Sequence, residues 1–98
     1  MTKRDWLWGD PRPISSTISE VASNAGLTYE QMVGPCRRKP IVRARHAAMY
    51  LAYRTLGKST TQIGKAFGNR DHTTVLHAIR AVEARPHLYP IGAADAHS

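Results

Sequence analysis

Apolar residues recur at helical spacing along most of this chain, in several short segments rather than in one long stripe. The first stripe, formed by Ile18, Val21 and Ala22, begins near Ile14 and ends at the Asn-Ala-Gly sequence of residues 24–26. Such a stripe gives a helix one face to bury, and a glycine commonly follows the last turn. The pattern therefore predicts a first short helix in this segment.

The rest of the chain contains the start and stop signals of further helices. Thr28 can cap one or two turns that stop before Gly34-Pro35. Small and apolar residues at helical spacing predict a longer helix over about 41–56. The Ser-Thr-Thr-Gln sequence from residue 59 has the form of a capping box and predicts a helix over about 59–67, and a last apolar stripe predicts a helix over about 70–85.

The last two predicted helices are joined by a Gly-Asn turn, which is the outline of a helix-turn-helix. In that motif the second helix places its N-terminal residues against base edges in the major groove. The second helix here starts with the polar run Arg-Asp-His-Thr-Thr of residues 70–74, and its apolar stripe follows. We see no strand pair and no internal repeat. The expected fold is therefore all-α, with the helix-turn-helix packed on the long helix and on short N-terminal helices.

The two ends of the chain have a different pattern from this helical domain, which is expected to span residues 14–85. Residues 1–13 hold Trp6, Leu7 and Trp8 followed by a glycine and two prolines, which forbid a continuous helix and predict an extended arm. The two indole rings either tuck back onto the core or form a hook for a protein partner. Residues 86–98 contain two prolines and no periodicity, so a flexible tail is expected there.

The positive charge is concentrated on the helix-turn-helix region. The chain of 98 residues has a net charge of +7, and residues 37–85 hold eleven Lys and Arg against Asp71 and Glu83. Basic charge concentrated on one module suits a polyanion, because each contact with a phosphate releases condensed counterions. The alternative is a generically basic surface with no specific partner.

Other classes of protein fit the sequence poorly. No apolar run approaches the roughly 20 residues that span a bilayer, no signal-peptide pattern is present, and Cys36 has no second cysteine to pair with, so a cytoplasmic protein is expected. The histidines lack the spacing of metal ligands. Residues 52–59 match a relaxed phosphate-loop pattern, but they follow a predicted helix rather than a strand. We therefore expect no metal, no bound nucleotide, no cofactor and no enzymatic activity.

Three motifs carry a resemblance to a known family. They are Ile-Val-Arg-Ala-Arg-His at 41–46, Ile-Gly-Lys-Ala-Phe-Gly at 63–68 and Arg-Asp-His-Thr-Thr-Val-Leu-His at 70–77. From Arg37 to about Arg80 the chain resembles, without a gap, the C-terminal DNA-binding domain of the bacterial replication initiator DnaA. The last motif is highly specific to that family.

The resemblance implies recognition of a short asymmetric duplex, the DnaA box of the TTATNCACA type. It implies base contacts by Asp71, His72 and Thr73 in the major groove and by Arg37 in the adjacent minor groove, with Arg38 in that role if the register slips by one. The residues that it places on the DNA backbone are Arg38, Arg45, His46, Thr60, Thr61, Arg70, Thr74 and His77.

Four positions depart from the usual family pattern. Thr60-Thr61 replaces a common Leu-Pro, so hydroxyl bonding would replace an apolar contact and affinity or site preference could shift. Ala44 stands where a proline is common, and Tyr53 stands where a lysine that contacts the backbone is common. Asn69 replaces the second glycine of the turn, which Asn tolerates because it adopts left-handed conformations more readily than most residues.

The sequence therefore leads to two hypotheses about function. The first is a box-binding protein, bacterial or phage-borne and nucleoid-associated, that modulates replication initiation or transcription; we expect no ATPase activity, since 98 residues do not hold an ATPase module as well. The second is an interaction adaptor that keeps the fold and binds the initiator or another replication protein through Trp6, Leu7 and Trp8.

Overall fold

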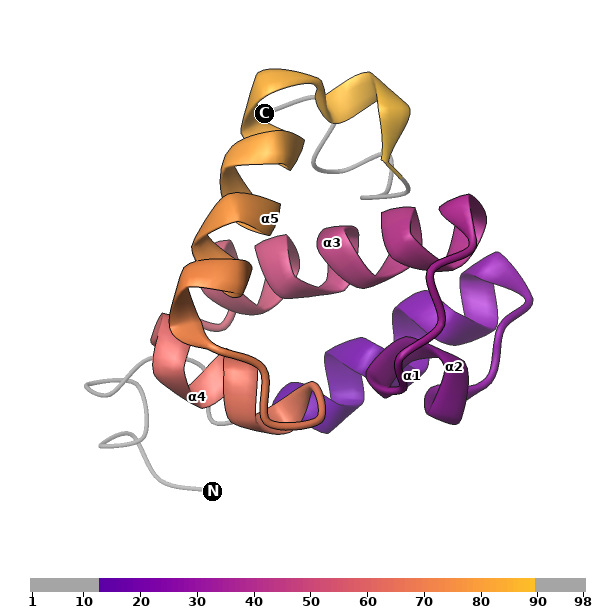
Figure 1. The fold of residues 1–98 in the computed structure, drawn as a ribbon, viewed down its shortest axis with the longest axis horizontal. Coiled ribbons are helices and arrows are strands. Elements are labelled where there is room, and N and C mark those ends of the chain that lie inside the picture. The colour runs from indigo at the N-terminus through magenta and orange to yellow at the C-terminus, as the bar shows by residue number, and fades with distance from the viewer. Residues whose placement is uncertain (1–12, 90–98) are drawn as a thin grey trace.

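The computed structural model describes residues 13–89, and every regular element in that range is helical. The elements are α1 (Ile14–Ala25), α2 (Tyr29–Val33), α3 (Lys39–Arg54), α4 (Thr60–Ala66), α5 (His72–Ala84) and the 3-10 helix η2 (Pro86–Leu88). Helix α3 lies in the middle, with α5 packed across it and with α1 and α2 against its other side (Figure 1). The all-α fold with a helix-turn-helix, formed by α4 and α5, is confirmed. None of the described helices has the length and apolar character to cross a membrane.

The short helices begin and end where local hydrogen bonds are available for their terminal groups. Gly26 ends α1 with a φ of 71°, a left-handed conformation that glycine adopts without strain. Thr28 with Gln31, and Ser59 with Gln62, form complete capping boxes at the starts of α2 and α4. These boxes satisfy backbone N–H groups that have no partner within a helix. The sequence predicts the box at Ser59 and the cap at Thr28, and the structure adds Gln31 as the partner of Thr28.

The starts of two helices differ by two residues from the predicted ones. Helix α3 begins at Lys39 rather than near residue 41, because Pro40 fits the first turn of a helix, where its missing N–H costs no hydrogen bond. Helix α5 begins at His72 rather than at residue 70, because Asp71 is an extended N-cap with φ −66° and ψ 148°. Arg70 therefore belongs to the turn, and this difference changes where its side chain points.

A continuous hydrophobic core joins all five α-helices. Helix α3 contributes four fully buried alanines, 44, 47, 48 and 52, which let the neighbouring helices approach closely. The largest fully buried side chains are Phe67, Ile18, Met32, Met49, Leu56, Ile63, Val75 and Val82. The buried residues of α5 begin at Val75, so the side chains of its first turn do not pack in the core.

Residues 86–88 form the 3-10 helix η2, at the start of the segment that is expected to be a flexible tail. Pro86 opens η2, in which the Tyr89 N–H donates to the Pro86 carbonyl at 3.1 Å. Tyr89 then packs against Ala47 and Val82, and this apolar contact holds the segment to the domain. The predicted arm, with Trp6, Leu7 and Trp8, and the rest of the tail lie outside the described residues.

Gly64 allows the turn between α4 and α5 to fold back on α4. The Arg70 N–H donates to the Gly64 carbonyl at 2.8 Å, and a Cβ on the buried Gly64 would collide with the Arg70 carbonyl oxygen. Gly68 and Asn69 complete the turn with φ values of 74° and 61°. The predicted Gly-Asn turn is thus present, and Asn69 adopts the left-handed conformation that is expected of it.

We expect Gly64→Ala to lower the free energy of unfolding by about 3 kcal/mol, because the collision is with backbone that must shift. Gly57→Ala is the matched control, since Gly57 also has a positive φ of 68° but open space around its Cβ position. Its cost should be about 1 kcal/mol. Urea denaturation of the two variants and the parent measures both values, and equal losses would contradict this account of Gly64.

Candidate nucleic-acid interface

The start of α5 presents four exposed polar side chains in succession, Asp71, His72, Thr73 and Thr74. Asp71 is the N-cap residue, yet its carboxylate makes no capping bond, although such a bond typically stabilises a helix by about 1 kcal/mol. Its Oδ1 lies 3.3 Å from Nδ1 of His72, and both side chains remain largely open to solvent. The first turn of α5 therefore offers hydrogen-bonding groups to a partner outside the chain.

His77 extends this polar surface along α5. It is exposed and lies four residues after Thr73, so both side chains are on the same face of the helix. The opposite face holds Val75, Ile79 and Val82 in the core. Thr60 and Thr61 are separate from this row, on the first turn of α4, where Thr61 is exposed and Thr60 is half-buried.

Arg70, expected on the DNA backbone, is turned toward the protein and is half-buried. Its guanidinium donates to the Val33 carbonyl at 3.0 Å, to the Gly34 carbonyl at 2.5 Å and to the Phe67 carbonyl. Burial lowers the pKa of Arg70. The first residue of the Arg-Asp-His-Thr-Thr run thus fastens the turn to the end of α2, whereas the next four point outward.

Arg45, also expected on the DNA backbone, is buried at 6% exposure. Its Nε donates to the Met32 carbonyl at 2.7 Å, and its Nη2 donates to the carbonyls of Gln31 and Gly34 at 2.9 and 3.0 Å. The last carbonyls of a helix have no partner within it, and Arg45 supplies one. Burial and, next, the positive charge of Arg70 lower the pKa of Arg45.

The sequence did not predict that Arg45 and Arg70 bond to backbone carbonyls, because every residue has a carbonyl and a sequence does not show which carbonyls become buried. One weak signal was available. Helix α2 has no basic residue in its last turn to interact with its final carbonyls, so donors from elsewhere in the chain are required if that end is buried.

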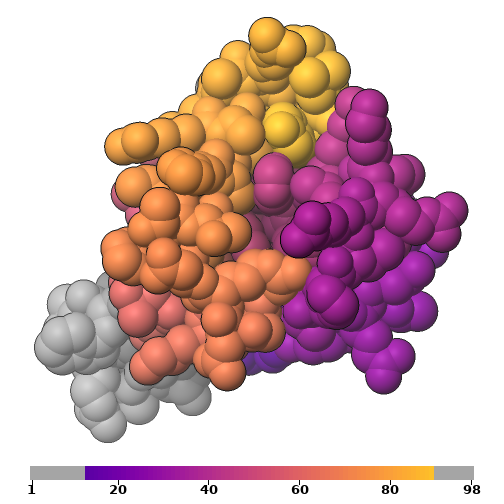
Figure 2. All heavy atoms as spheres, in the orientation of Figure 1, coloured from indigo at the N-terminus to yellow at the C-terminus, as the bar shows by residue number. Residues whose placement is uncertain are grey.

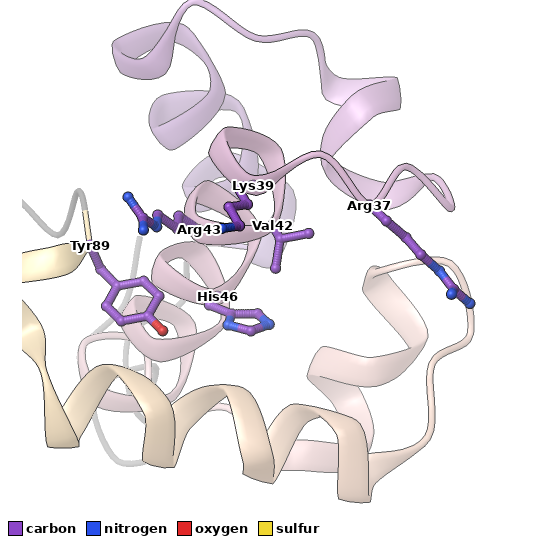
Figure 3. Close-up of a pocket in the computed structure, with 6 residues that line it drawn as sticks. All are labelled: Arg37, Lys39, Val42, Arg43, His46 and Tyr89. Carbon is purple, nitrogen blue, oxygen red and sulfur yellow. The ribbon is translucent and has the colours of Figure 1, made fainter.

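The exposed Arg37 and Arg38 lie just before α3, in the segment that Arg70 ties to the turn. Gly34, which accepts the bond from Arg70, is three residues before Arg37. In Figure 3 the Arg37 side chain extends toward the turn between α4 and α5. The structure thus brings Arg37 to the same end of the molecule as the start of α5.

A hollow of about 250 Å³ lies beside this region, and Figure 2 shows the surface recessed between η2, α5 and the start of α3. Its lining residues are Arg37, Lys39, Val42, Arg43, His46 and Tyr89 (Figure 3). His46, expected on the DNA backbone, is half-buried in its wall, and its ring stacks on that of Tyr89 with centroids 6.1 Å apart. Burial, followed by the positive charges of Arg45 and Arg70, lowers the pKa of His46.

Residues 52–59 span the end of α3 and the cap of α4, so the relaxed phosphate-loop pattern follows a helix and not a strand. Ala52 is buried in α3, which ends at Arg54, and Ser59 caps α4. Cys36 is a half-buried free thiol. Within residues 13–89, no three His, Cys, Asp or Glu side chains lie close enough together to hold a metal ion.

A short helix, a left-handed turn and a second helix with an exposed polar start define a helix-turn-helix protein. A family model described as the bacterial dnaA protein helix-turn-helix matches residues 14–82. The chain belongs to this family.

Its relatives are much longer proteins. It is 42% identical over 64 residues to the chromosomal replication initiator protein DnaA of Cereibacter sphaeroides, a match that covers 65% of this chain and 14% of that protein. It is 44% identical over 77 residues to the DnaA of Thermus thermophilus, over 79% of this chain and 17% of the relative. The chain therefore spans about a sixth of the length of these relatives.

A solved structure has the same fold. The chain matches a crystal structure of a DNA replication initiation factor with a TM-score of 0.71 and 35% identity, over 76% of this chain and 23% of the other.

We expect Arg45→Met to lower the free energy of unfolding by at least about 3 kcal/mol, because the buried carbonyls of Gln31 and Met32 would lose their donor and that of Gly34 would keep only Arg70. Arg54→Met, at an exposed position in the last turn of the same helix, should change it by no more than about 0.5 kcal/mol. Chemical denaturation followed by circular dichroism tests both. A stable Arg45→Met variant that binds DNA poorly would restore the original backbone-contact prediction.

Protonation of His46 should destabilise the fold. Since its pKa in the folded state is lowered from 6.5, the unfolded chain takes up the proton first as the pH falls, and stability is lost below about pH 6.5. We expect the drop in melting temperature between about pH 7.5 and about pH 5.5 to be smaller for His46→Gln than for the parent. Equal drops in both proteins would show that His46 does not contribute to the pH dependence.

Proposed function

We propose that this chain binds double-stranded DNA at DnaA-box-like sites through the start of α5 and thereby modulates replication initiation or transcription. The observation that carries the proposal is the row of exposed polar side chains from Asp71 to Thr74, in which the Asp71 carboxylate is not used to cap its own helix. A helix-turn-helix reads bases with this part of its second helix. Membership of the DnaA family supports the same conclusion.

The major-groove contacts follow from the chemistry of these side chains. The carboxylate of Asp71 suits the exocyclic amine of a cytosine, and the methyl group of Thr73 suits the methyl group of a thymine. His72, exposed beside Asp71, is the third base contact. Thr74 and His77 would bond to phosphates along the groove, as would Thr60 and Thr61 from α4.

Arg37 would enter the adjacent minor groove, with Arg38 as the neighbour that replaces it if the register shifts. Its position favours this role, because the bond between Arg70 and the Gly34 carbonyl holds the Arg37 segment beside the turn. Narrow A·T-rich minor grooves concentrate negative potential and attract arginine.

The distribution of positive charge supports a duplex partner even when Arg45 and Arg70, which face inward, are not counted. Arg45 and Arg70 bond to backbone carbonyls, but the other basic residues between 37 and 85 remain exposed except for the half-buried Lys58. These exposed cations can neutralise phosphates and displace counterions. The proposed activity is DNA binding without ATP hydrolysis, and it does not include the other activities of the longer relatives.

We expect a clear preference, on the order of tenfold or more, for a duplex with one DnaA-type box over its scrambled counterpart, with marked weakening at higher salt. Thr73→Ala and Arg37→Ala should each lower affinity for the box about tenfold and change affinity for the scrambled duplex little. Fluorescence-anisotropy titrations at two or three salt concentrations measure these affinities.

Lys65→Ala is the matched control, because Lys65 is an exposed cation on α4. Its loss should weaken binding to both duplexes alike, or to neither. Equal losses on both duplexes for Thr73→Ala would remove the base-reading role, and equal affinity of the parent for both would overturn the proposed function.

A further inference from the structure

The hollow between α3 and Tyr89 has the charge of an anion site. Arg37, Lys39 and Arg43 contribute three permanent positive charges, and no Asp or Glu is among the described residues that line it. Val42 supplies an apolar part of its wall. A cavity walled by one sign of charge attracts a group of the opposite sign.

One wall of this hollow comes from a segment that the family model does not cover. The match ends at residue 82, whereas Tyr89 follows η2 and reaches the hollow by packing on Ala47 and Val82. Tyr89 stacks on His46 and thereby fixes the imidazole ring in the wall. The site is thus completed by residues outside the region that is shared with the family model.

His46 contributes a polar atom that has no partner within the described part of the chain. Its Nδ1 is buried and makes no hydrogen bond there, although buried polar atoms normally have one. His46 thus brings a ring nitrogen with unused hydrogen-bonding capacity to the wall of the hollow.

We propose that this hollow holds one backbone phosphate of duplex DNA that flanks the box, so that α3 and Tyr89 form a second contact beside the reading helix. This inference rests on the proposed function. The hollow and the start of α5 share Arg37, which lies in the hollow's lining and in the segment that Arg70 ties to the turn. That continuity favours the duplex over an acidic peptide, because a duplex bound at the start of α5 with Arg37 in its minor groove would leave Lys39 and Arg43 as the cations for an adjacent phosphate.

The test combines neutralised phosphates with a charge-removing variant. Duplexes that carry the box and a single methylphosphonate at each flanking position in turn are titrated with the parent chain and with Arg43→Ala. One flanking position should weaken binding of the parent about fivefold or more, and Arg43→Ala should be insensitive to the same change. Arg43→Ala should also reduce the salt slope by about one phosphate contact.

Arg54→Ala is the matched control, since it removes the same charge from an exposed position at the other end of α3. It should keep the full sensitivity to the methylphosphonate. Tyr89→Phe, which keeps the stacked ring, should also keep the sensitivity to the methylphosphonate. Tyr89→Ala should lose this sensitivity and still prefer the box over the scrambled duplex. This last comparison shows that the fold and the reading helix are intact.

The two proposals fail in different ways. If the parent prefers the box but no flanking methylphosphonate has an effect that depends on Arg43, the phosphate site is wrong and the proposed function stands. If the parent shows no box preference, the proposed function itself fails. Binding of a labelled poly-glutamate peptide that depends on Arg43, with no such dependence on the duplex, would overturn the phosphate site in favour of an acidic protein partner.

Discussion

Two arginines that bond to the carbonyls of four consecutive residues hold this structure together. Arg45 donates to residues 31, 32 and 34, and Arg70 donates to residues 33 and 34, so the end of α2, the middle helix and the helix-turn-helix meet at one place. Each guanidinium is partly or wholly removed from water, and the carbonyls offset the cost of that burial. The same carbonyls would otherwise lack partners, because they end a helix of only five residues.

The basic residues therefore form two groups: Arg45 and Arg70, which face inward, and the exposed cations. The inward pair determines where the turn lies relative to the segment that follows α2, and the outward cations remain available for phosphates. In the polar run of residues 70–74, the change from inward-facing to outward-facing side chains occurs between Arg70 and Asp71. Arg70 lies in the turn and faces the protein, whereas Asp71 is an extended N-cap, and from there the side chains face solvent. A reading surface that rests on a rigid support orients its side chains at little cost on binding.

Local signals predicted most of the fold. The cap at Thr28, the capping box at Ser59, the glycine stop at residue 26 and the Gly-Asn turn all form where the sequence predicts them. Such signals work because they involve residues within one turn of each other. The segment from Pro86 to Tyr89 has no periodicity, yet it forms η2, and Tyr89 packs against Ala47 of α3 and Val82 of α5. No local rule detects such a contact.

The candidate interface shows the same division between local and distant causes. The sequence by itself determined the all-α class, the helix-turn-helix, the polar start of its second helix and the concentration of positive charge, since these depend on periodicity and composition. Only the tertiary structure decided that Arg45 and Arg70 face inward and that Arg37 lies beside the turn. The reason is physical: an arginine donates to whichever acceptors lie within its reach, and these carbonyls take up their positions only after the helices have packed.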